Sequence, residues 1–136
     1  MEMNHEAEVL VAEIQRYGLD HDLVISVEVR EVDGQSDVTD IWLDLHAEVG
    51  PEVLVSHVAS DPHCRISVQD FTFEEVEGQH VPEFVYQAFQ GERTLAIEER
   101  PLSRWRVLRL HVSGIEYVAT VRLNRDPLDE WEVARL

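Results

Sequence analysis

Short stretches in which apolar and polar residues alternate are the feature that most constrains the fold of this chain. Alternation with a period of two is typical of a strand that buries one face and exposes the other. The stretches with this pattern are 23–30, 41–48, 64–68, 108–112 and 115–123. Ser113 and Gly114 separate the last two stretches and predict a tight hairpin. The first two stretches are expected to form another hairpin, with a longer connection.

The first residues carry a different pattern, with apolar side chains three and four positions apart. These side chains are Ala7, Leu10, Val11, Ile14 and Tyr17. Such spacing places them on one face of an amphipathic helix. Asn4 is suited to cap the start of this helix, and Gly18 to end it in the left-handed conformation. We predict a helix over residues 5–17.

A second helix is predicted after Pro82, a residue that fits the first turn of a helix. Its apolar side would consist of Phe84, Val85, Ala88 and Phe89. Gly91 is expected to end it.

The remaining segments are assigned from shorter patterns. They are strands at 53–58 and 95–97, a charged loop at 74–78, and a last strand or short helix at 131–136. Phe71 and Phe73 have the opposite parity from Ile66 and Val68, so a β-bulge is expected between the two pairs.

Together the elements predict an α+β fold with the N-terminal helix first. We expect a mostly antiparallel sheet of about five to seven strands, with two helices covering one face. The 136 residues and the apolar fraction of 44% fit a single domain that spans 1–136.

The charge of the chain is strongly negative and unevenly distributed. The sequence holds 28 acidic residues and 11 basic ones, all of them arginine, for a net charge of −17. Residues 1–85 hold 20 of the acids and three arginines, whereas residues 86–136 hold eight of each. Such a field repels nucleic acids and anionic lipids and attracts basic proteins. We therefore expect a basic protein partner, and neither direct nucleic-acid binding nor membrane association.

The sequence also bears on the cellular compartment. No apolar run approaches the roughly 18 residues that cross a bilayer, and the first residues are acidic, unlike a secretory signal. The one cysteine, Cys64, has no second cysteine for an internal disulfide. A cytoplasmic protein is expected.

One predicted strand presents a row that suits a basic partner. The outward residues of this row are Asp40, Trp42, Asp44, His46 and Glu48. Carboxylates beside an exposed indole can receive arginine or lysine side chains, and tryptophan is a frequent energetic anchor of interfaces. We predict these five residues as the partner-binding site. The alternative is a solvated strand face, or a tryptophan covered by a helix.

The densest group of metal-ligand residue types is His57, Asp61, His63 and Cys64. A turn at Asp61 could gather them around zinc, or give Cys64 a histidine base. Their spacing matches no standard zinc signature, and Cys64 has the parity of a buried residue. The favoured interpretation is a surface turn beside a core cysteine.

No standard catalytic or cofactor motif is present in the sequence. It contains neither a P-loop, nor a glycine-rich phosphate loop, nor HExxH, nor a serine nucleophile elbow. We therefore predict no enzymatic activity, no cofactor and no metal. The arginines of the last third that are expected to point outward and pair with nearby acids are Arg106, Arg109, Arg122 and Arg125.

A predicted hairpin near the C-terminus carries a family resemblance. Its residues are Trp105, Val107, Leu110, Gly114 and Tyr117. With the N-terminal helix, the early antiparallel strands and the helix from Pro82, this order of elements resembles bacterial toxin-immunity proteins of the YezG type. The resemblance implies binding and inactivation of a nuclease toxin inside the producing cell. It assigns no site residue.

Three functions remain open from the sequence. The first is an inhibitor, immunity protein or nucleic-acid mimic that masks a basic partner and presents one acidic face. The second is a domain of a salt-adapted or high-GC organism, with acids spread evenly over its surface. The third is a small enzyme or metal-binding protein with a pocket at His57, Asp61, His63 and Cys64.

Overall fold

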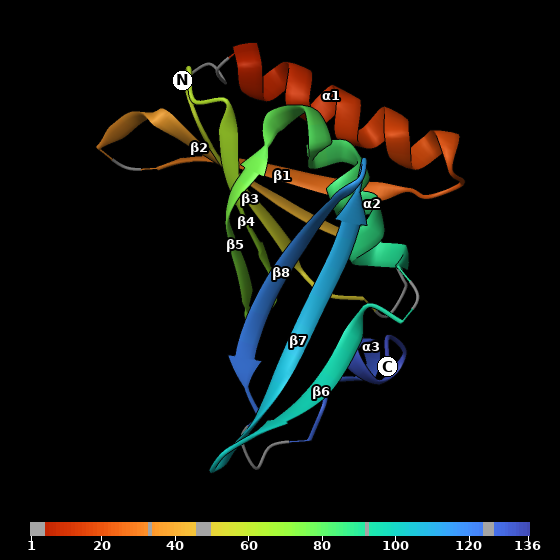
Figure 1. Ribbon diagram of the computed structural model, residues 1–136. Coiled ribbons are helices and arrows are strands. Elements are labelled where there is room, and N and C mark those ends of the chain that lie inside the picture. Colours follow the sequence, from red (N-terminus) through yellow and green to blue (C-terminus); the bar gives the residue numbers. More distant parts are fainter. Residues whose placement is uncertain (1–4, 33, 46–49, 92, 124–126) are drawn as a thin grey trace.

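The computed structural model describes residues 5–32, 34–45, 50–91, 93–123 and 127–136. Its helices are α1 (His5–Asp20), the 3-10 turn η1 (Gly78–His80), α2 (Val81–Gln90) and α3 (Glu130–Val133). Its strands are β1 (Ile25–Val32), β2 (Gln35–Leu45), β3 (Val53–Val58), β4 (His63–Val68), β5 (Phe71–Glu77), β6 (Leu95–Arg100), β7 (Ser103–Val112) and β8 (Ile115–Arg122). The α+β class and the leading helix are confirmed, and the eight strands of the described part form two antiparallel sheets (Figure 1).

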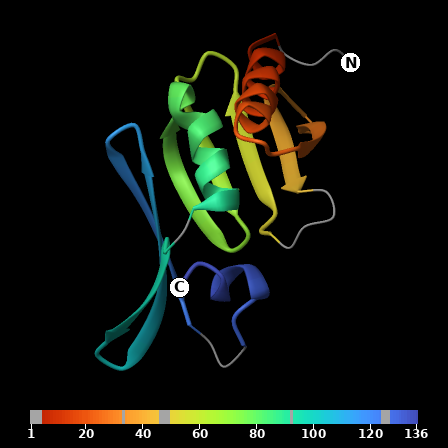
Figure 2. The same cartoon turned by 90° about the vertical axis from the view of Figure 1, so that its right-hand side faces the viewer.

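Sheet A is a meander in the order β1-β2-β3-β4-β5. Its inner face carries the alternating apolar residues expected from the sequence, among them Ile41, Val55 and Ile66, each fully buried. Helices α1 and α2 pack over this face (Figure 2). No helix of the described residues covers the opposite face of sheet A. No helix in the described ranges is long and apolar enough to span a bilayer.

The end of α1 differs from the prediction. The helix continues to Asp20, and Gly18 lies inside it rather than ending it. Asp22 takes the left-handed position instead, with φ of 59°. The amide of Leu23 donates to the carbonyl of Gly18 at 2.8 Å, which closes a Schellman motif. Gly18 is required for close packing, because a Cβ there would lie 2.8 Å from the Leu23 oxygen.

The parity change at Phe71 has a different cause from the predicted bulge. Gln69 and Asp70 form a two-residue turn, with Gln69 at φ of 50°, so Val68 and Phe71 pair directly across a hairpin. Paired residues point to the same face of a sheet, which is why both are buried. The prediction of a charged loop at 74–78 is also wrong for residues 74–77, because β5 continues to Glu77.

Sheet B has the order β6-β7-β8 and lies beside the β5 edge of sheet A (Figure 1). Its β7–β8 hairpin turns at Ser113 and Gly114, both at positive φ, as the sequence predicted. Tyr117 on β8 joins the two sheets. Its hydroxyl accepts a hydrogen bond from the backbone of Glu77 at 3.3 Å, and its ring packs edge-on against Phe84.

Arg106 is turned inward, against the expectation that it points to solvent. It shares the parity of Leu108 and Leu110, and its guanidinium lies over the ring of Phe71, 5.5 Å from the ring centroid. One of its amino groups donates to Glu132 of α3 at 2.8 Å. Glu132 is only 1% exposed, so this ion pair fixes the C-terminal helix from inside the protein.

Arg135 fixes the same segment to α2. Its guanidinium is buried and donates to the backbone carbonyls of Ala88, Phe89 and Gly91, at the C-terminal end of α2. Those carbonyls have no partner within the helix, and the negative end of the helix dipole favours a cation there. Burial lowers the pKa of Arg135 from its ordinary value.

Candidate functional site

The helix-free face of sheet A carries the predicted tryptophan. On this face Trp42 lies between Glu28 of β1 and Leu54 of β3, its partners in the two neighbouring strands. Trp42 is 36% exposed, although a tryptophan is usually highly buried. An indole left on an open face of a sheet is a frequent feature of interfaces.

Three members of the predicted row share this face. Asp40, Trp42 and Asp44 alternate with the buried residues of β2 and point outward as the parity predicted. Asp40 accepts a hydrogen bond from the hydroxyl of Ser56 at 2.8 Å. His46 and Glu48 lie outside the described residues.

A hollow of about 410 Å³ lies beside the indole. The residues that line it include Ser26, Glu28, Arg30, Trp42, Asp44 and Glu52. Arg30 is held by Glu28 at 2.8 Å, so these two charges cancel. Asp44 and Glu52 form no ion pair with any other described residue. We call Trp42, Asp44 and Glu52, with the hollow between them, the acidic hollow.

The acidic hollow has the chemistry to bind a cation. Its two unpaired carboxylates attract a guanidinium or ammonium group, and the indole face stabilises such a group within about 6 Å. Glu52 was not predicted as a site residue, because it follows Pro51 and belongs to no alternating stretch. The sequence gives little indication of its role, since a single glutamate beside Pro51 forms no periodic pattern with its neighbours.

Acidic residues also lie away from this face. On the opposite layer, those of α1 are Glu6, Glu8, Glu13 and Asp20. In sheet B and α3, by contrast, Glu98, Glu116 and Glu132 are each paired with an arginine. The negative excess found before residue 86 therefore surrounds sheet A and is not confined to one side of it.

The group around Cys64 is only partly brought together. His57 and Cys64 lie on the inner face of neighbouring strands, and both line a hollow of about 340 Å³ with Glu6 and Asp61. Nε2 of His57 is 3.4 Å from a carboxylate oxygen of Glu6. His63 points to the opposite face of the sheet.

The thiol of Cys64 is unsuited to nucleophilic chemistry. Burial, and then the charge of Asp61, raise its pKa to about 11, so it is protonated at neutral pH. No group of three or more His, Cys, Asp or Glu residues in the described part of the chain could hold a metal ion.

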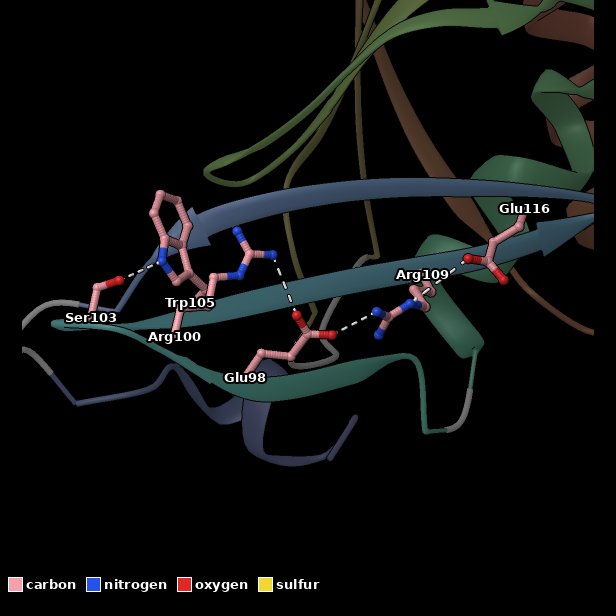
Figure 3. A network of polar contacts seen from close by, with 6 residues as sticks. All are labelled: Glu98, Arg100, Ser103, Trp105, Arg109 and Glu116. Carbon is pink, nitrogen blue, oxygen red and sulfur yellow. Dashed lines mark hydrogen bonds and ion pairs between the residues drawn. The ribbon is translucent and has the colours of Figure 1, made fainter.

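A second tryptophan was not predicted as a site. Trp105 lies on the outer face of sheet B, where Arg100 stacks over its ring at 5.1 Å from the centroid (Figure 3). The indole N–H donates to the hydroxyl of Ser103 at 2.8 Å. Arg122 is the partner of Trp105 in β8. Its partner in β6 is Glu98, so Trp105 has charged neighbours of both signs.

A ladder of ion pairs crosses the same face (Figure 3). Glu98 accepts from Arg109 at 2.7 Å and from Arg100 at 3.3 Å, and Arg109 lies 3.8 Å from Glu116. The hydrogen bond from Arg109, followed by that from Arg100, lowers the pKa of Glu98. The expected pairing of Arg109 with nearby acids is thus present, whereas Arg125 lies outside the described residues.

Comparisons with known proteins bear on the resemblance drawn from the hairpin. No family model matches the chain, and no curated protein and no solved structure matches it either.

Proposed function

We propose that this chain is a non-enzymatic acidic binding protein that masks a basic protein in the cytoplasm. The partner class is a nuclease-type toxin or another protein whose surface evolved for phosphates. The carrying observation is the acidic hollow, in which Trp42 is exposed beside Asp44 and Glu52. An arginine or lysine side chain of the partner would lie over the indole with its charge between the two carboxylates.

The energetics support Trp42 as the centre of such a contact. Truncating a tryptophan at the centre of an interface costs about 2 kcal/mol or more, which is about a 30-fold loss of affinity. The single carboxylates at the rim contribute less each, and their contribution falls as salt rises. We therefore expect Trp42 to set the lifetime of the complex and the acids to set its rate of formation.

A salt-adapted domain is the second candidate, and one observation favours it. Acids cover α1 as well as the helix-free face, an arrangement that a surface adapted to high internal salt would share. The two candidates differ in what affinity capture returns, because a salt-adapted domain needs no stoichiometric basic partner. Stability does not separate them, since screening of the same acids by salt favours the fold in both cases.

The test is affinity capture from the host with a set of matched baits. Wild type, Trp42→Ala, Asp44→Arg and Glu8→Arg are immobilised, washed at low salt and eluted with salt. Glu8→Arg is the control, since it makes the same change in charge on the layer of α1. Thermal melts establish that all four baits are folded.

The proposal expects one basic protein, in stoichiometric amount, on the wild-type and Glu8→Arg baits and not on the other two. The purified partner should lose its activity when the wild-type chain is added. Equal capture by all four baits would instead identify general charge attraction, and the proposed site would be wrong.

A further inference from the structure

The turn between β6 and β7 exposes a leucine in a strained backbone conformation. Leu102 is 100% exposed and has φ of 63°. With Pro101 before it, the turn follows the type II pattern, in which this position favours glycine. Strained residues persist where surrounding structure or function holds them. In both overall views this turn lies at the far end of sheet B, pointing away from sheet A (Figures 1 and 2).

Arginines surround this leucine. Leu102 borders a depression of about 450 Å³. The charged residues that line this depression are three arginines, Arg100, Arg104 and Arg122, and one acid, Glu99. Arg104 and Arg122 are exposed on opposite faces of sheet B, and neither forms an ion pair with a described residue. We call Leu102, Arg104 and Arg122 the basic tip. The tip thus combines an apolar anchor with two free positive charges on an otherwise acidic protein.

We propose that the basic tip of one copy of this chain docks into the acidic hollow of a second copy. The charges are complementary, since the two free arginines, one on each face of sheet B beside the turn, would flank the free carboxylates of Asp44 and Glu52. Leu102 would enter the hollow beside Trp42, which at about 410 Å³ has room for a leucine side chain. The inference rests on the proposed function in one respect, because it uses the same face as the binding site.

The geometry makes this association head-to-tail. The tip and the hollow are different surfaces, so the contact is heterologous and leads to rings or open chains. A tip cannot fold back into the hollow of its own chain, because Tyr117 fixes sheet B at the edge of sheet A and the tip points outward. The association competes with a basic partner for Trp42 only where the chain is concentrated enough to self-associate.

The contact should be weak. A single turn in a shallow hollow buries little surface, which places it among transient interfaces. The net charge of −17 adds repulsion, although charges farther than about 8 Å from the contact are largely screened at physiological salt. Association is therefore expected at hundreds of micromolar, a concentration accessible to sedimentation.

The test uses two complementary double variants. Arg104→Gln/Arg122→Gln removes the tip, and Trp42→Ala/Asp44→Asn removes the hollow. Arg16→Gln/Arg93→Gln is the control, because it removes two exposed arginines outside the tip and so matches the tip variant in net charge. Sedimentation velocity measures the average mass of each over a concentration series up to about 1 mM.

Wild type and control should rise together above the monomer mass of 15.7 kDa, while each double variant stays at that mass. An equimolar mixture of the two double variants should form a species of twice the monomer mass and nothing larger. Each pair then has one intact tip and one intact hollow. A mixture that stays monomeric, or a tip variant that associates like wild type, overturns the proposal.

The same variants separate this inference from the proposed function. If the wild type stays monomeric at about 1 mM, self-association is refuted whatever the capture experiment gives. The tip variant should still capture the basic host partner, because its hollow is intact. Loss of capture by the tip variant would show that the tip also contacts the host partner, which would overturn the assignment of the partner site to the hollow alone and not the docking between copies.

Discussion

The buried pair of Arg106 and Glu132 gives the sharpest prediction for stability. Glu132→Gln keeps the shape of the side chain and its acceptor for the Asp129 amide, but removes the charge that faces Arg106. Asp70 is 3.7 Å from the same guanidinium and remains, although it is largely solvated. A charged hydrogen bond contributes about 1.5–3 kcal/mol, and removing one partner of a buried pair costs about 3–5 kcal/mol.

Because Asp70 compensates in part, we expect Glu132→Gln to lower the free energy of unfolding by about 2–3 kcal/mol. With a urea m-value of about 2 kcal/mol/M, the midpoint should fall by roughly 1 M. Tryptophan fluorescence follows the transition. Glu130→Gln, exposed on the same helix, is the control and should change stability by less than about 0.5 kcal/mol.

A second variant tests the same buried ion pair. Arg106→Met/Glu132→Leu replaces both charges with apolar groups of similar length, and such replacements are often neutral or stabilising. We expect the double variant to be more stable than Glu132→Gln. If Glu132→Gln costs less than about 1 kcal/mol, the pair is solvated in solution and its role in fixing α3 is refuted.

Three further predictions concern single groups. Native Cys64 should react with a disulfide reagent at about pH 8 at least about 100-fold more slowly than in urea, because burial raises its pKa to about 11. Asp22→Gly should stabilise the protein by about 0.5 kcal/mol in urea titrations, since glycine adopts the left-handed position without strain. The lowered pKa of Glu98 means that its contribution to stability is present at neutral pH and is lost as the pH falls through that pKa. Arg109→Gln should therefore raise the pKa of Glu98, as followed by carboxyl NMR.

The strands were predictable from the sequence because burial on one face imposes a period of two. The division into two sheets was not, since periodicity says which face is buried but not which strand is the neighbour. The change of parity at Phe71 illustrates this point. A bulge and a two-residue hairpin both reverse the pattern, and only the pairing of Val68 with Phe71 distinguishes them.

Arg106 was predicted to point to solvent because of its charge, and this prediction was wrong. Its parity agreed with the buried Leu108 and Leu110, but its charge suggested solvent. The fold satisfies both properties, because the guanidinium lies over Phe71 and reaches a glutamate from a helix 26 residues later. Such a partner is invisible to local pattern, as is the arrival of Glu52 beside Trp42.

The placement of the acids suggests how affinity and rate divide between residues. Acids on α1 and on the helix-free face both contribute to the long-range field that draws a basic partner inward. In the proposed complex, only those beside Trp42 can remain in contact with the partner. Changes in charge on α1 should therefore alter the association rate and its salt dependence, whereas Trp42→Ala should mainly speed dissociation. The broad acidity is then compatible with one specific face, because the indole and its two free carboxylates supply what the field alone does not.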